Sequence, residues 1–348
     1  MNTIYRHIDV CLNRISEGLR VIDEIIRFHL QDEILLKDIK EIRHSVRSFF
    51  SISDVELLNC RDSVNDKGFN FSLKSEEKRT DIISIARSSF KRVIESLRVL
   101  EEYSKLEEIK KLTNINIEKL RQSIYYYEKT VLLKLESLKK ISIITQKIYP
   151  ITPDFGNSIN GNEKLIKYCI EINKVSNFIQ LRLKNRSKKE LISIISDIKK
   201  ETNGELEIII NDHLDICISE NLLGVHLGQD DLPLSAAKQI LGNEKIIGIS
   251  THNANQAEKA INGGADYIGI GPIYETKTKN TGYKPLGLKM LKEINNLSLD
   301  KNILSFAIGG INKDNIEDVF ETNVTGAAII SELREDTVKF YNILLSQQ

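Results

Sequence analysis

The chain has 348 residues, enough for two domains, because single hydrophobic cores rarely grow beyond about 300 residues. Its 49 basic and 49 acidic residues give zero net charge, so we do not expect a nucleic-acid partner, which normally requires a basic excess. The four cysteines form no Cys-x-x-Cys pair and predict neither a disulfide framework nor a zinc knuckle. No signal peptide or apolar run of about 18 residues is visible, so we expect a soluble, cytoplasmic protein without a membrane partner.

Residues 1–140 are predicted to form an all-α helical-bundle domain. Proline is absent before Pro150, glycine occurs only at Gly18 and Gly68, and apolar residues recur at helical spacing. We expect long helices near residues 8–30, 35–50, 76–106 and 114–140, packed against one another as a bundle.

One charged motif occurs twice in this region. Arg14-Ile-Ser-Glu-Gly-Leu-Arg-Val-Ile-Asp-Glu24 recurs as Arg92-Val-Ile-Glu-Ser-Leu-Arg-Val-Leu-Glu-Glu102. At about 3.6 residues per turn, arginine and glutamate share one face of each helix. One interpretation is a pair of related helices with Arg–Glu ion pairs between them. The other is a charged pocket for a phosphorylated ligand, since buried ion pairs alone stabilise a fold weakly.

From residue 145 onward, short apolar runs alternate with amphipathic helical segments, which is the pattern of βα units and a parallel sheet. Strands are predicted at residues 148–152, 178–183, 206–210, 224–227, 246–250, 267–270, 303–308 and 325–330. Helices are predicted near residues 161–173, 187–202, 213–220, 233–241, 253–262, 286–296, 312–321 and 332–346. This α/β pattern favours a TIM (βα)8 barrel over residues 145–348. The alternative, an open doubly wound sheet, would need a Gly-x-Gly-x-x-Gly turn where Thr152-Pro153-Asp154 stands.

The ends of the second to fourth predicted strands carry side chains suited to a diphosphate and a cation. Active sites of TIM barrels lie on the loops that follow the strands. By strand alternation Gln180, Arg182 and Lys184 point together into the barrel mouth, where two cations and an amide suit a diphosphate. Adjacent strand ends supply Asp212 and Asp231, and two carboxylates completed by phosphate oxygens and water fit Mg²⁺. Helix N-capping is the alternative for both aspartates, because each precedes a predicted helix.

The later strand ends predict a second anion site. Gly309-Gly310 follow the seventh strand and Ser331 follows the eighth, where backbone N–H groups can approach a phosphate. A plain turn would also explain the two glycines. The loop after the sixth strand, residues 276–279, offers hydroxyls and ammonium groups to an anion, although a solvated loop has the same composition. A diphosphate beside a separate monophosphate and magnesium predicts displacement of pyrophosphate.

These segments resemble thiamine phosphate synthase. They are Gln180-Leu-Arg-Leu-Lys184, Ile210-Asn-Asp212, Gly224-Val-His-Leu-Gly-Gln229, Gly248-Ile-Ser-Thr-His252, Gly269-Ile-Gly-Pro-Ile-Tyr274, Thr276-Lys-Thr-Lys279, Ile308-Gly-Gly-Ile311 and Ile330-Ser331. The resemblance covers about residues 145–345 and implies that hydroxymethylpyrimidine diphosphate is joined to a thiazole phosphate, with release of pyrophosphate. A related thiazole tautomerase-like isomerase is the alternative, but an isomerase of a monophosphate has no need for the magnesium pair.

The resemblance also implies three groups of binding residues. The pyrimidine diphosphate would be bound by Gln180, Leu181, Arg182, Leu183, Lys184, Asn211, Ser250 and Lys279. One Mg²⁺ would be held by Asp212 and Asp231. The thiazole phosphate would be bound by Thr276, Lys277, Thr278, Gly309, Gly310, Ile330 and Ser331. Lys279, Arg182 and Lys184 would be the catalytic residues, neutralising the departing pyrophosphate.

The first domain resembles a helical domain that precedes thiamine phosphate synthase in some bacteria and also occurs alone. The resemblance lies in residues 13–28, 43–47, 61–68 and 87–105. It implies hydroxymethylpyrimidine phosphate kinase activity with ATP as co-substrate, although the sequence has no glycine-rich P-loop and assigns no catalytic residue. A purely structural or oligomerisation role is the alternative, and a homo-oligomer is compatible with either.

Overall fold

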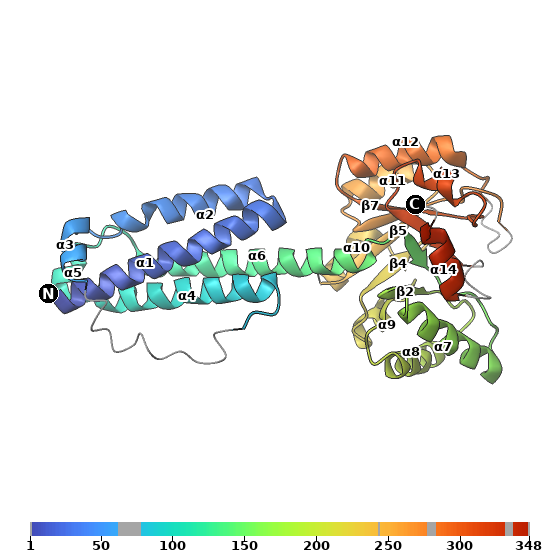
Figure 1. The fold of residues 1–348 in the computed structure, drawn as a ribbon, viewed down its shortest axis with the longest axis horizontal. Coiled ribbons are helices and arrows are strands. Elements are labelled where there is room, and N and C mark those ends of the chain that lie inside the picture. Colours follow the sequence, from blue (N-terminus) through green and yellow to red (C-terminus); the bar gives the residue numbers. More distant parts are fainter. Residues whose placement is uncertain (1, 62–77, 243, 277–282, 331–336, 347–348) are drawn as a thin grey trace. The chain divides into compact units, whose positions relative to one another are not determined.

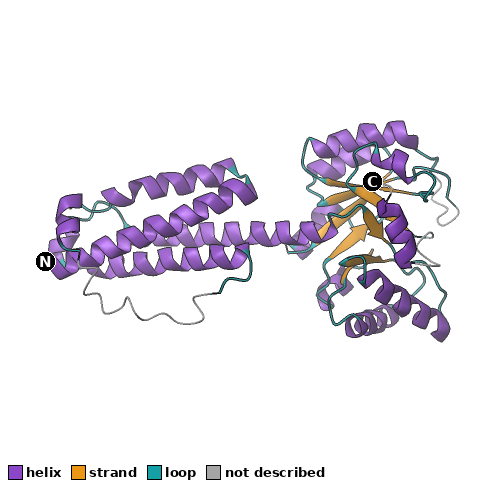
Figure 2. Ribbon diagram, in the orientation of Figure 1, coloured by secondary structure: helices purple, strands orange, loops and turns teal. Residues whose placement is uncertain are grey.

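A computed structural model describes residues 2–61, 78–242, 244–276, 283–330 and 337–346. The chain divides into two compact units, Met1–Glu136 and Ser137–Gln348. The first unit is helical, and the named β-strands of the described residues all lie in the second (Figures 1 and 2). No helix in the described part of the chain is long and apolar enough to cross a membrane.

The helical unit confirms the predicted all-α bundle. Its α-helices are α1 (Asn2–Ile25), α2 (Glu33–Ser45), α3 (Asp54–Asn59), α4 (Ile82–Tyr103), α5 (Glu107–Lys110) and the greater part of α6 (Ile117–Ile144). A π-helical turn, η1 (Ile26–Leu30), extends α1, and a 3-10 turn, η2 (Val46–Ser48), follows α2. Helix α1 begins earlier than predicted. Helix α4 begins later, where the Asp81 side chain accepts a hydrogen bond from the backbone N–H of Ser84 and caps the helix.

The two copies of the charged motif lie on α1 and α4, which pack closely. A Cβ atom added at Gly18 would lie 2.6 Å from Cγ2 of Val93, so glycine permits this approach. Most motif ion pairs lie within one helix, such as Arg20–Glu24 at 2.6 Å. Arg92 and Glu17 pair between the helices, but at 3.9 Å and with both side chains more than half exposed. Exposed pairs of this kind contribute little, so buried apolar side chains of α1 and α4, such as Leu19 and Val93, hold the two helices together.

The second unit is a closed parallel barrel. Its strands are β1 (Ile148–Pro150), β2 (Phe178–Leu181), β3 (Glu207–Asn211), β4 (Gly224–Leu227), β5 (Ile246–Thr251), β6 (Tyr267–Ile270), β7 (Leu304–Ile308) and β8 (Gly326–Ile329). They pair in the order β1-β8-β7-β6-β5-β4-β3-β2. A parallel bridge between Ile151 and Gln180 joins the two ends of this order. The predicted TIM barrel is therefore confirmed, and the open-sheet alternative is wrong.

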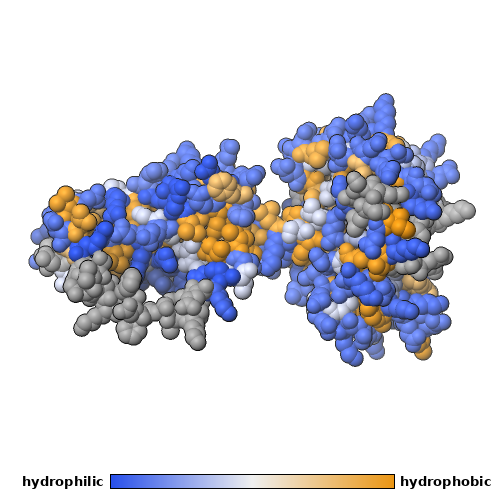
Figure 3. Space-filling model, in the orientation of Figure 1, coloured by the Kyte–Doolittle hydropathy of each residue, from blue (hydrophilic) through white to orange (hydrophobic). Residues whose placement is uncertain are grey.

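The barrel helices cover the outside of the sheet. They are α7 (Ile159–Asn173), α8 (Lys188–Glu201), α9 (Leu214–Ser219), α10 (Leu234–Leu241), α11 (Ala254–Asn262), α12 (Gly287–Leu299), α13 (Ile316–Phe320) and α14 (Thr337–Ser346). Outward strand residues such as Ile208 and Ile210 share a buried cluster with the apolar faces of these helices. On the face shown in Figure 3, hydrophilic residues predominate over the surface of this unit.

Inward strand residues divide the barrel interior into an apolar and a polar part. Tyr149, Phe178, Tyr267 and Phe306 pack together, with ring centroids of Tyr149 and Phe306 4.8 Å apart. The last inward position of β2, β3, β4 and β5, at the carboxyl end of each strand, carries a polar side chain. These residues are Gln180, Asn211, His226 and Ser250. The polar part of the interior is thus the mouth in which a TIM barrel carries its active site.

Candidate active site

The ends of β2 and β3 form the first part of the site. Gln180 is buried, while the backbone N–H of Arg182 donates to Oγ1 of Thr152 at 2.8 Å. Burial lowers the pKa of Arg182, and the charges of Asp212 and Asp154 act in the opposite direction. The guanidinium is therefore a cation close to carboxylates at the inner wall of the mouth.

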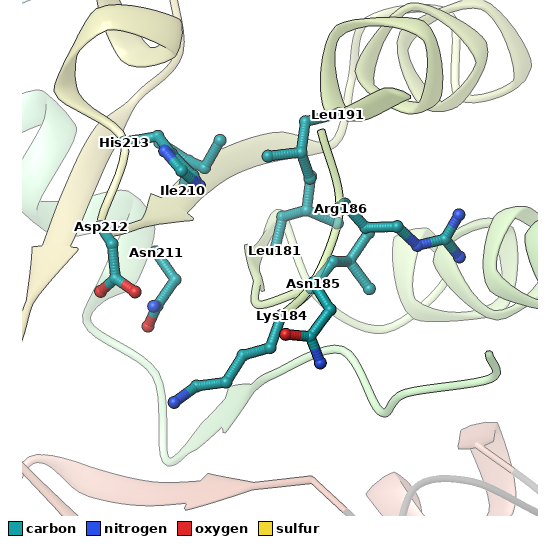
Figure 4. A pocket seen from close by; sticks show the side chains of 10 residues that line it. Leu181, Lys184, Asn185, Arg186, Leu191, Ile210, Asn211, Asp212 and His213 are labelled. Atoms are coloured by element: carbon teal, nitrogen blue, oxygen red, sulfur yellow. The ribbon is translucent and has the colours of Figure 1, made fainter. Parts of the chain in front are cut away.

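A cavity of about 310 Å³ lies between these two strand ends. Leu181 and Leu183 supply apolar walls, and Lys184, Asn211 and Asp212 supply polar ones. Figure 4 shows Lys184, Asn211 and Asp212 reaching toward the same side of this cavity. The structure thus brings together residues that the sequence predicts for diphosphate binding with one of the two predicted magnesium ligands.

Asp212 and Asp231 meet at the ends of β3 and β4. Their carboxyl groups form a side-chain hydrogen bond, and Oδ2 of Asp231 also accepts from the backbone N–H of Gly228 at 2.6 Å. Burial, followed by the hydrogen bond and charge of Asp231, raises the pKa of Asp212 to about 6, against the opposing charges of Lys184 and Arg182. Two carboxylates this close repel each other unless a proton or a cation lies between them.

The N-capping alternative for the two aspartates is wrong. Helix α9 follows His213 and α10 follows Pro233, and neither helix has a side-chain cap at its start. Asp212 adopts a left-handed backbone conformation with φ of 68°, which directs its carboxyl toward Asp231 instead. This arrangement fits a divalent cation with two protein carboxylates. Since the described residues contain no group of three or more His, Cys, Asp or Glu suited to a metal, its other ligands would be phosphate oxygens and water.

Ser250 is joined to the barrel interior through His226. Its Oγ lies 2.8 Å from Nε2 of His226, and Nδ1 of the same ring lies 2.9 Å from the Tyr267 hydroxyl. The Tyr267 hydroxyl in turn lies 2.6 Å from that of Tyr149. The resemblance implies a role for Ser250 in binding the diphosphate, whereas the sequence alone gives His226 no such role. Sequence reasoning missed both tyrosines, which read as ordinary apolar strand positions.

The loops after β6 and β7 form the other end of the site. Gly309 and Gly310 have φ of 103° and 65°, and a Cβ atom at Gly310 would lie 2.5 Å from the carbonyl oxygen of Glu275. The backbone N–H of Tyr274 donates to the Gly309 carbonyl at 3.0 Å. The glycines therefore let the two loops pack, which places them beside the segment that leads to Thr276. Their role in phosphate binding remains a prediction.

The remaining residues predicted to bind the two substrates are either half-buried or lie outside the described residues. Thr276 is half-buried in the loop after β6, and Ile330 is half-buried directly after β8. Lys277, Thr278, Lys279 and Ser331 lie outside the described residues.

A closed βα barrel whose mouth gathers cations, amides and a paired carboxylate defines an enzyme of the phosphate-binding TIM-barrel class. Residues 148–333 match the family model described as thiamine monophosphate synthase, and residues 6–130 match the ThiD2 family. The chain belongs to the thiamine phosphate synthase family, whose members are transferases.

Named relatives match this chain over nearly its whole length. The thiamine-phosphate synthase of Nostoc sp. is 33% identical over 337 residues, covering 95% of this chain and 90% of that protein. The thiamine-phosphate synthase of Prochlorococcus marinus strain AS9601 is 35% identical over 339 residues, with the same coverage of 95% and 90%. The solved thiamine phosphate pyrophosphorylase of Pyrococcus furiosus has 30% identity and a TM-score of 0.50, covering 59% of this chain and 96% of that one.

Proposed function

We propose that the barrel joins hydroxymethylpyrimidine diphosphate to a thiazole phosphate, with Asp212 and Asp231 holding the Mg²⁺ that the diphosphate requires. The observation that carries this proposal is the hydrogen-bonded carboxyl pair beside Arg182 and Lys184. A monophosphate isomerase has no use for such a pair, whereas a departing pyrophosphate needs both a cation site and basic side chains.

The protein's contribution to this reaction is electrostatic. Mg²⁺ would neutralise part of the charge that develops on the departing pyrophosphate. Arg182 and Lys184, with Lys279 from the loop after β6, donate charge-assisted hydrogen bonds to its oxygens. Gln180, Asn211 and Ser250 hold the pyrimidine diphosphate in place. The thiazole nitrogen, oriented through its phosphate by the loops after β6 to β8, then attacks the methylene carbon of the pyrimidine. A C–N bond forms where the C–O bond to the departing pyrophosphate has broken, and no protein nucleophile is needed.

The test is formation of thiamine phosphate from preformed pyrimidine diphosphate and thiazole phosphate. We expect product and pyrophosphate in equal amounts, loss of activity on chelation of divalent cations, and recovery when Mg²⁺ is restored. Full activity in the presence of a chelator would rule out the role given to Asp212 and Asp231.

For the helical unit we propose phosphorylation of the pyrimidine monophosphate by ATP, which would supply the diphosphate to the barrel. The match of residues 6–130 to the ThiD2 family is consistent with this role and also with a purely structural one. Two buried carboxylates on α1 favour the kinase role. Asp9 accepts hydrogen bonds from Nε and Nη2 of Arg61, and Asp23 lies 3.2 Å from Nη2 of Arg43. Buried charges are costly to a fold that gains nothing else from them.

One assay separates the two proposals. The whole chain is supplied with hydroxymethylpyrimidine monophosphate, ATP, Mg²⁺ and thiazole phosphate, and thiamine phosphate is measured. Product is expected only if the helical unit makes the diphosphate. If product forms from preformed diphosphate alone, the kinase proposal fails while the synthase proposal stands.

A further inference from the structure

Four side chains form a hydrogen-bonded chain from the apolar interior of the barrel to its mouth. It runs from the Tyr149 hydroxyl to the Tyr267 hydroxyl, on to His226, and ends at the Ser250 hydroxyl, with successive distances of 2.6, 2.9 and 2.8 Å. The chain therefore connects Ser250, a proposed ligand of the pyrimidine diphosphate, to buried residues that have no proposed contact with substrate.

Both tyrosines keep their protons. Tyr149 and Tyr267 are almost fully buried, and burial raises the pKa of each well above its usual value. Each hydroxyl therefore has one proton to donate. Among the described residues, the Tyr149 hydroxyl has a single hydrogen-bond partner, the Tyr267 oxygen. A buried hydroxyl proton without an acceptor is unfavourable, so Tyr149 donates to Tyr267.

The direction of every other bond follows from this one. The described hydrogen-bond partners of the Tyr267 hydroxyl are the Tyr149 hydroxyl and Nδ1 of His226. Because the Tyr267 oxygen accepts the proton of Tyr149, its own proton goes to Nδ1 of His226. With Nδ1 accepting, the neutral ring carries its proton on Nε2 and donates it to Ser250.

We propose that Tyr267 is a positioning residue that holds His226 in the Nε2–H tautomer, so that the Ser250 hydroxyl points its proton into the barrel mouth toward the diphosphate. In the opposite tautomer Nε2 would accept the Ser250 proton, and the hydroxyl would offer a lone pair to an anion. The orientation therefore decides whether Ser250 attracts or repels a phosphate oxygen. This inference rests on the proposed function only for the identity of the anion.

The tautomer can be measured without any substrate. With ¹⁵N-labelled histidine, two-bond ¹H–¹⁵N correlations distinguish the two ring nitrogens, and His226→Gln assigns the signals of His226. We expect the Nε2–H tautomer in the wild-type chain and in Tyr149→Phe, in which Tyr267 still donates to Nδ1. We expect a mixture of tautomers in Tyr267→Phe. A proton on Nδ1 in the wild-type chain overturns the proposal.

Kinetics then test the consequence, with Tyr149→Phe as the matched control. Both variants remove one buried hydroxyl from the same pair, but only Tyr267→Phe releases the histidine. We expect Tyr267→Phe to raise KM for the pyrimidine diphosphate roughly tenfold, the loss of about one charge-assisted hydrogen bond, while KM for the thiazole phosphate stays unchanged. Tyr149→Phe should leave both values near wild type. Equal effects of the two substitutions would contradict a positioning role.

A double-mutant cycle shows whether Tyr267 acts through Ser250. We expect Tyr267→Phe to cause no further loss in a Ser250→Ala background, because the hydroxyl that it orients is already gone. Independent, multiplicative losses would overturn the proposal. If the wild-type chain makes no thiamine phosphate, the proposed function fails, and the NMR result still decides the tautomer.

Discussion

Asp212 and Asp231, which follow adjacent strands of the barrel, share a hydrogen bond between their carboxyl groups. The pair is unfavourable by itself, since two carboxyl groups in contact cannot both ionise without a cost in free energy. Residues that bind a cation commonly lower the stability of the empty protein in this way. Stability and activity should therefore respond in opposite directions when one of the two charges is removed.

Asp212→Asn tests this opposition directly. Asparagine tolerates the left-handed backbone at this position and keeps a hydrogen bond to Asp231 while removing one charge. We expect Tm in the presence of a chelator to rise by about 2–4 °C at pH 8, and synthase activity to fall at least about tenfold. Because the folded-state pKa of Asp212, about 6, lies above its unfolded value, the penalty grows as pH rises from about 4 to 6. The gain in Tm should thus vanish near pH 4. Asp215→Asn, on α9, is the control and should change neither property much.

Lys184→Ala should reduce kcat/KM for the pyrimidine diphosphate by about 10–100-fold, since a charge-assisted hydrogen bond contributes about 1.5–3 kcal/mol. KM for the thiazole phosphate should stay near wild type. Arg186→Ala is the matched control from the same cavity wall, because its guanidinium donates to the Gly156 carbonyl and extends away from Asp212 (Figure 4). Steady-state kinetics with each substrate varied in turn provide the measurement. Similar losses in the two variants would remove Lys184 from the site.

Gly248→Ala should destabilise the barrel severely. The added Cβ atom would lie 1.9 Å from Cζ of Tyr267, a ring enclosed on all sides by the barrel interior. We expect a loss of about 3 kcal/mol or more, or failure to fold, because overpacking in a rigid core displaces backbone. Gly269→Ala, on the adjacent strand, places its Cβ atom at an ordinary 3.4 Å from Cε1 of His226 and should be tolerated. Chemical denaturation of both variants measures the free energy of unfolding, and equal values for the two would contradict this prediction.

Asp32 gives the helical unit an acid-sensitive helix start. Its side chain accepts from the backbone N–H of Leu35 and pairs with Lys134 at 2.9 Å, and these two contacts lower its pKa. A lowered folded-state pKa contributes stability that is present above the unfolded value of about 3.9 and is lost as pH falls through the folded one. Asp32→Ala should therefore cost about 1 kcal/mol at pH 7 and less below about pH 4. Asp32→Asn, which keeps the cap, should cost less at pH 7. A constant difference between Asp32→Ala and wild type from pH 7 to 3 would contradict this.

The barrel could be predicted from sequence because apolar alternation and strand spacing are local signals. Strand ends were less predictable, since they depend on side chains from elsewhere. Strand β2 was expected to continue to Leu183 but ends at Leu181, because the next backbone N–H bonds to the Thr152 hydroxyl. Helix α13 was expected from residue 312 and begins at Ile316, because Asn312 and Asn315 form a side-chain-bonded turn before it.

The candidate site was predictable where position along a strand suffices. Asp212 and Asp231 follow neighbouring strands, so their proximity follows from topology alone. The link from Tyr149 to Tyr267 could not be anticipated, because these residues lie on β1 and β6, and their contact depends on the closure and stagger of the barrel. Only the structure could show whether the two aspartates cap helices. An aspartate that lies between a strand and a helix fits both a helix cap and a metal ligand.

The packed rings of Tyr149, Phe178, Tyr267 and Phe306 close one end of the barrel interior. Molecules that reach the polar side chains therefore enter and leave through a single opening at the carboxyl ends of the strands. In the proposed reaction, pyrophosphate departs by the route through which the next diphosphate arrives, and it leaves a site that still favours its charge. Pyrophosphate should accordingly compete with the pyrimidine diphosphate, so that its accumulation slows the reaction.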